Sequence, residues 1–92
     1  MSLLSDDEIQ AKLDEAEEWS REGDSIKRTF KFDDFQGSVD FVNRITPPAE
    51  EMNHHPDIAI SWNKVELTLT THSEGGLTEN DFAMAARFDE LA

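Results

Sequence analysis

All three histidines of this chain, His54, His55 and His72, lie in its second half, and Asp81 follows them closely. Imidazole titrates near neutral pH, so a group of histidines can move protons, ligate a metal ion or simply lie on the surface. A carboxylate beside one imidazole would orient it and raise its basicity. By themselves these residue types favour a surface location, with acid–base catalysis and a metal site as the alternatives.

The metal site is the weaker alternative. Adjacent residues such as His54 and His55 point in different directions in most backbones, so both rarely ligate one ion. Helical zinc-binding pairs typically occupy positions i and i+4, and the chain has no cysteine to complete a site. Asp81 could add a ligand, so the residues alone leave the alternative open, although we expect no metal.

Asp81 itself has two interpretations. It ends the run Thr78-Glu79-Asn80-Asp81, which is typical of a capping box in which the acid accepts from the cap residue. It also shares a helical face with Met84, Ala85 and Phe88, which would turn it inward, towards the histidines. The spacing supports both interpretations equally.

The residues before the histidines predict a helix followed by a hairpin. A helix over residues 6–18 is expected because Ser5 and Glu8 form a capping box. Short strands over 19–22 and 25–32 follow it, separated by a Gly-Asp turn. Alternation along the second strand places one set of side chains on its inner face: Ile26, Arg28, Phe30 and Phe32.

A second helix is expected to begin after Asp33 or Asp34, either of which can cap it. Its apolar residues recur with helical spacing. The expected buried stripe consists of Phe35, Val39, Val42 and Ile45. Because Pro47-Pro48 lacks two backbone donors, we expect a kink or a restart near Thr46.

The last third predicts a second hairpin and a final helix. Strands are expected over 58–62 and 65–71, with His72 ending the second one, and Gly75-Gly76 forming a loop before a helix capped by Thr78. Two sets of side chains should face inward: Val65, Leu67 and Leu69 from the strand, and Met84, Ala85, Phe88 and Leu91 from the helix. The order α-β-β-α-β-β-α predicts an α+β fold, a single domain over 1–92 with a four-stranded antiparallel sheet and three helices on one face.

Composition limits the function classes. The chain has 92 residues, with 21 acidic against 8 basic residues and a formal net charge of −13. The negative electrostatic field of such a protein makes nucleic acid and anionic membranes poor partners. The chain also has few lysine and arginine side chains to displace the counterions of a polyanion. Two explanations of the acidity are open: an ordinary acidic protein, or adaptation to high salt. The acidic residues are spread along the whole chain, which favours adaptation to high salt. No signal peptide or membrane span is recognisable, so a cytoplasmic protein is expected.

A longer pattern resembles a known family. The runs Asn53-His54-His55-Pro56-Asp57, Trp62-Asn63-Lys64-Val65-Glu66-Leu67-Thr68-Leu69-Thr70-Thr71-His72 and Gly75-Gly76-Leu77-Thr78, with Asp81, are similar to the signature of pterin-4a-carbinolamine dehydratases. Members of this family are also called dimerisation cofactors of a homeodomain transcription factor. The resemblance implies the same fold as the element order does.

The resemblance also implies a reaction and the residues that carry it. A 4a-hydroxy-tetrahydropterin loses water to give a quinonoid dihydropterin, without metal or cofactor. His54, His55, His72 and Asp81 match the family's active-site residues. We expect His54 and His72 to transfer protons, His55 to hold the pterin, and Asp81 to orient a histidine. The remaining expected substrate contacts are Pro56, Trp62, Thr70 and Thr71, with the backbone at the strand end reading the pterin's amide edge.

Several features depart from the family pattern or leave alternatives open. Ile58 stands where many relatives have Trp, Trp62 stands where Tyr is usual, and Pro47-Pro48 replaces what is usually continuous helix. Ile58 and the proline pair bear on the shape of the pocket, and hence on which pterin side chain it accepts. For Trp62 itself, a role as a sheet or interface aromatic is favoured over a platform on which the pterin stacks. The alternative functions are a non-catalytic pterin-binding or assembly module of the same fold, or a related step in molybdopterin metabolism. A homodimer or homotetramer is expected, because the sheet leaves two free edges.

Overall fold

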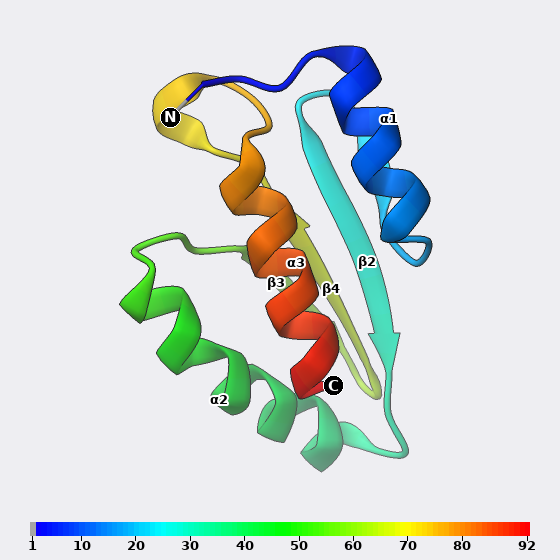
Figure 1. The fold of residues 1–92 in the computed structure, drawn as a ribbon. Helices are drawn as coiled ribbons and strands as arrows, with labels where there is room; N and C mark the ends of the chain where they lie inside the picture. The colour runs from blue at the N-terminus through cyan, green and yellow to red at the C-terminus, as the bar shows by residue number, and fades with distance from the viewer. Residues whose placement is uncertain (1) are drawn as a thin grey trace.

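A four-stranded antiparallel sheet organises the chain in this computed structural model, which describes residues 2–92 (Figure 1). Its strands are β1 (Ser20–Glu22), β2 (Ser25–Lys31), β3 (Asp57–Ser61) and β4 (Lys64–Leu69), and they lie in the order β1-β2-β4-β3. The two central strands, β2 and β4, therefore carry the buried part of the sheet, while β1 and β3 form its edges. Three α-helices within residues 2–92 complete the predicted α-β-β-α-β-β-α order.

The core lies between the helices and one face of the sheet. In the β2–β4 ladder, Ile26 pairs with Leu69 and Phe30 with Val65, so the apolar residues of both strands share one face. All the predicted inward residues of β4 are buried, as are Ile26 and Phe30. The alternation of the sequence thus confirms the inner face and the register. None of the helices within residues 2–92 has the length and hydropathy needed to cross a membrane.

Helix α1 spans Asp6–Glu15 and begins at the predicted capping box, in which Ser5 and Glu8 exchange hydrogen bonds. The predicted end at residue 18 was three residues too late. The Ala16 N–H donates to the carbonyls of Lys12 and Leu13, and the Trp19 N–H then donates to the Ala16 carbonyl. This turn brings the Trp19 indole into the core, where burying a large aromatic ring outweighs another helical turn.

Helix α2 spans Phe35–Glu51, and it continues through Pro47 and Pro48. The predicted restart near Thr46 was therefore wrong. The prolines deprive the carbonyls of Asn43 and Arg44 of their helical donors, but both residues are exposed, so water can serve these carbonyls.

The buried stripe of α2 also differs from the prediction. Phe35 is 55% exposed and Val39 is only partly buried, whereas Ile45 is buried as expected. Phe41, which the prediction left out, is fully buried, and its ring centroid lies 4.7 Å from that of Phe30. The stripe is rotated on the helix because Phe41 reaches the sheet and Phe35 lies at the helix start, beyond the edge of the core.

Strand β4 ends at Leu69, and His72 begins a short 3-10 turn over His72–Glu74, so the predicted strand was too long. Gly75 ends this turn with φ of 75°, a conformation that glycine adopts without strain. Helix α3 (Glu79–Leu91) then begins at the predicted Thr78 cap. Met84, Ala85 and Phe88 are buried as expected. In Figure 1, α3 lies between α1 and α2.

Candidate active site

His54 and Asp81 form a buried pair at one end of the sheet. His54 lies in the connection between α2 and β3, where its backbone N–H donates to the backbone carbonyl of Ala49. Its Nε2 atom lies 2.6 Å from Oδ1 of Asp81, which is in the first turn of α3. The side chain of His54 is 10% exposed and that of Asp81 is fully buried. Water is thus largely excluded from the contact, which strengthens it.

The second carboxylate oxygen of Asp81 has two donors of its own. Oδ2 accepts from the Thr71 hydroxyl and from the Thr78 N–H, each at 2.9 Å. The Thr71 and Thr78 hydroxyls also share a hydrogen bond of 2.8 Å. A buried carboxylate is stable only with such partners. Both interpretations of Asp81 therefore hold together: one oxygen caps α3, and the other contacts the histidine.

This arrangement fixes how the imidazole of His54 can work. An ionised carboxylate only accepts hydrogen bonds, so Nε2 of His54 is the donor to Asp81. Its Nδ1 atom is then left to take or release a proton at a ligand. The pair has the geometry of a histidine oriented by an acid, an arrangement that can serve acid–base catalysis.

His55 lies apart from this buried pair. Its Nε2 atom is 3.4 Å from Oε2 of Glu50, in the last turn of α2, and its side chain is 52% exposed. An exposed pair of this length adds little stability. Glu50 was not among the predicted site residues, and its only signal in the sequence was its place shortly before the histidines, in the last turn of the helix.

His72 follows Thr71 directly and is exposed at the start of the 3-10 turn. Its imidazole has no hydrogen-bond or ion-pair partner within residues 2–92. The backbone joins it to the buried cluster, because Thr71 contacts Asp81. No three His, Asp or Glu side chains in the described part of the chain converge as metal ligands would.

The expected substrate contacts are placed unevenly. Pro56 is partly buried next to His55, and the hydroxyl of Thr70 donates to the Asp24 carbonyl at 2.6 Å. The N–H of Thr71 donates to Gly76 and its carbonyl accepts from Glu74 and Gly75. The backbone N–H and carbonyl of Thr71 are therefore already engaged within the turn, and the neighbouring His72 carbonyl accepts from the Gly75 N–H.

Trp62 is not brought to the histidines within one chain. It lies at the turn between β3 and β4, with its side chain 67% exposed and its carbonyl accepting from Ser38. His54 precedes the opposite end of β3, and the five residues of that strand span roughly 16 Å. The large exposed ring is instead placed beside the β3 edge.

Comparisons with known proteins identify the family of the chain. The family model described as pterin 4 alpha carbinolamine dehydratase matches residues 2–91. The chain belongs to the pterin-4a-carbinolamine dehydratase family. A relative from a Picosynechococcus strain, provisionally named a pterin-4-alpha-carbinolamine dehydratase, is 53% identical over 88 residues, which cover 96% of each chain.

Two solved structures extend this likeness to the fold. A transcriptional coactivator/pterin dehydratase from Brucella melitensis has a TM-score of 0.92 and 35% identity, covering 97% of both chains. A pterin dehydratase-like protein identified as a RuBisCO assembly factor in the alpha-carboxysome has a TM-score of 0.67 and 27% identity, covering 80% of this chain and 86% of its own. Members of this family fold are thus described in more than one role.

Proposed function

We propose that the chain is a hydro-lyase that dehydrates a 4a-hydroxy-tetrahydropterin to the quinonoid dihydropterin by histidine acid–base catalysis. In this reaction the C4a–O bond breaks, the hydroxyl leaves as water after gaining a proton, and N5 releases a proton. No electrons pass to another molecule, so one acid and one base suffice. The observation that carries the proposal is the buried His54–Asp81 pair, together with membership of the dehydratase family.

The proposed roles follow from the surroundings of each histidine. His54 is oriented by Asp81, so its Nδ1 atom exchanges the proton with the pterin. His72 is exposed on the adjoining turn, and it acts on the other proton. His55, beside Glu50, holds the ring in place. Asp81 is a positioning residue, because its two oxygens are occupied by protein groups.

A dehydration assay tests this proposal. The purified protein should accelerate water loss from a 4a-hydroxy-tetrahydropterin, and His72→Ala should remove most of the gain, with a matched Ser73→Ala control retaining it. The assay should be run from low to several molar salt, because the charge of −13 is best screened at high salt. A protein that binds no pterin and gives no rate enhancement in any of these buffers would contradict the proposal.

We also propose that the chain forms a homodimer or homotetramer through the β3 edge. Every residue of β3 is exposed, and its apolar side chains Ile58 and Ile60 lie next to the exposed Trp62. Pairing two such edges across a two-fold axis would satisfy free backbone groups and cover these side chains. Size-exclusion chromatography in low and high salt should give an oligomer, and Ile60→Lys should give a monomer.

An assembly module of the same fold is the second candidate. It is favoured by the likeness to the protein identified as a RuBisCO assembly factor. A partner captured equally well by wild type and by the His54→Ala, His72→Ala double variant would support a role separate from the histidines. A step in molybdopterin metabolism remains a further candidate for the same residues, and activity on that class of pterin, with none on a 4a-hydroxy compound, would favour it.

A further inference from the structure

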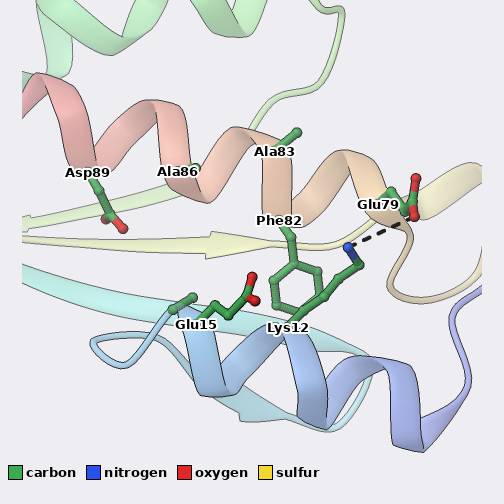
Figure 2. A pocket seen from close by; sticks show the side chains of 8 residues that line it. Lys12, Glu15, Glu79, Phe82, Ala83, Ala86 and Asp89 are labelled. Atoms are coloured by element: carbon green, nitrogen blue, oxygen red, sulfur yellow. Dashed lines mark ion pairs between the residues drawn. The ribbon is translucent and has the colours of Figure 1, made fainter.

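A groove separates α1 from α3, on the side of α3 that faces away from α2. Figure 2 shows it from close by, with side chains of both helices directed towards one another across the gap. Its volume is about 410 Å³. It is distinct from the histidine site, because its lining includes neither Asp81 nor any of the three histidines. Its surroundings have no part in the dehydration proposed above.

The floor of the groove is apolar, and the residues that form its walls have small side chains. The ring of Phe82 lies between the two helices (Figure 2), and three alanines, Ala16, Ala83 and Ala86, also line the groove. Side chains three or four residues apart share one helical face, so the alanines form a shallow wall beside the ring. Larger residues at these positions would fill the space. The groove is thus suited to receive an aliphatic side chain from outside.

The rim of the groove is acidic. Glu15 from α1 and Glu79 and Asp89 from α3 line it, and Lys12 is the only cation among the lining residues. Lys12 is 3.9 Å from Glu79, and Asp89 already accepts from Trp19 and Arg28. The carboxylate of Glu15 has no hydrogen-bond or ion-pair partner in the described part of the chain. One negative charge at the groove is therefore uncompensated.

The acidic rim continues along α1. A neighbouring hollow shares Lys12, Glu15 and Glu79 with the groove and adds Glu8 and Ala11 to its lining. The combined surface is longer than a single side chain. A ligand with one apolar stripe and flanking cations would match it along its length. The overall charge of −13 draws such a cationic ligand towards the surface.

We propose that this groove binds a short basic amphipathic segment of a partner protein. The aliphatic stem of a lysine or arginine lies on Phe82, Ala83 and Ala86, while its cation reaches Glu15. Neighbouring leucines of the segment cover the remaining apolar floor. A helix that presents its apolar face to a groove is a common mode of recognition between proteins. The volume accommodates a few side chains, which fits a segment better than a folded domain.

The test uses a synthetic helical peptide with leucines on one face and flanking lysines, titrated into the isotopically labelled full chain and followed by NMR. The amides of Glu15, Phe82, Ala83 and Ala86 should shift most. Glu15→Lys should weaken binding roughly tenfold, because an attraction becomes a like-charge contact. Asp14→Lys is the matched control: it changes the net charge equally from the neighbouring position, which does not line the groove.

A second variant separates shape from charge. Ala86→Trp fills the groove without altering the net charge, and it should abolish binding while the thermal unfolding curve stays cooperative. The inference is overturned if Asp14→Lys weakens binding as much as Glu15→Lys, if the shifts spread over the whole acidic surface, or if the peptide does not bind. Spermine binding as tightly as the peptide would also overturn it, by pointing to a small amine. Dehydratase activity should be unchanged in Glu15→Lys, so this inference can fail independently of the proposed reaction.

Discussion

Nε2 of His54 and Oδ1 of Asp81 are 2.6 Å apart, although the two residues are separated by 27 positions in the chain. The contact joins the end of α2 to the first turn of α3, so it depends on the packing of the two helices. The carboxylate of Asp81, which is hydrogen-bonded to the imidazole, also caps α3 by accepting a hydrogen bond from the Thr78 N–H. One side chain therefore links helix stability to the orientation of the proposed catalytic base, and its replacement should affect both.

Asp81→Asn should lower dehydratase activity by about a hundredfold or more, the scale of losing a positioned acid–base group. The amide keeps the shape but cannot accept at both ends, so either His54 or the Thr71 hydroxyl loses its partner. The free energy of unfolding should fall by about 1–3 kcal/mol for the buried group left unsatisfied. Steady-state kinetics and urea denaturation measure the two effects. Glu79→Gln, which changes an exposed acid of the same helical turn, should alter neither the activity nor the free energy of unfolding. Full activity in Asp81→Asn would refute the role of Asp81 as a positioning residue.

Thr71→Val should reduce activity by about tenfold and shift its pH profile, because the hydroxyl that donates to Asp81 is lost while the side-chain volume is kept. The shift distinguishes a positioning residue from one that only stabilises the fold. Thr71→Ser, which restores the hydroxyl, should recover most of the activity and the original profile. Thr68→Val, at a threonine within the preceding strand β4, is the control. An unchanged pH profile in Thr71→Val would show that the hydroxyl does not act through Asp81.

The sequence predicted the parts of the fold that depend on local periodicity. Alternation in β2 and β4 and the cap signals at Ser5 and Thr78 were confirmed, because each rests on neighbouring residues and on burial of one face. The rotated stripe of α2 could not be predicted in the same way. Phe35 and Phe41 are both compatible with a helical stripe, and only the position of the sheet decides which is covered.

The site was predictable in composition but not in geometry. The spacing of Thr78 and Asp81 allowed Asp81 to be either a helix cap or the partner of a histidine. It could not indicate that Asp81 would do both, with one carboxylate oxygen for each contact. Nor could it assign the partner to His54 instead of His72, since that choice depends on where β4 ends. Glu50 escaped notice because a single acid near a helix end is common.

Pro47→Ala should stabilise the protein. Alanine restores a donor to the Asn43 carbonyl in the interior of α2, where a proline costs about 3 kcal/mol, while the unfolded chain regains freedom worth about 0.4–1 kcal/mol. We therefore expect the free energy of unfolding to rise by about 1–2 kcal/mol in urea denaturation. Pro48→Ala is the comparison, because Pro48, unlike Pro47, is buried and its ring would leave a space when removed. Its gain should be smaller, and a less stable Pro47→Ala would indicate that the ring itself is needed.

Glu8→Gln should destabilise the protein at neutral pH and leave it unaffected in acid. The Ser5 N–H, which donates to Oε1 at 2.8 Å, and then the Ser5 hydroxyl hold the pKa of Glu8 below its usual range, with a smaller contribution from the charge of Lys12. A carboxyl whose pKa is lower in the folded state stabilises the fold above its unfolded pKa, about 4.3, and loses this contribution as the pH falls through the folded value. The melting temperatures of wild type and Glu8→Gln should therefore differ at pH 7 and converge below the folded pKa. Asp7→Asn is the control, because it removes a charge from the same turn but leaves the capping box intact. Its melting temperature at pH 7 should therefore differ less from that of the wild type. Equal differences for the two variants would assign the effect to the helix dipole alone.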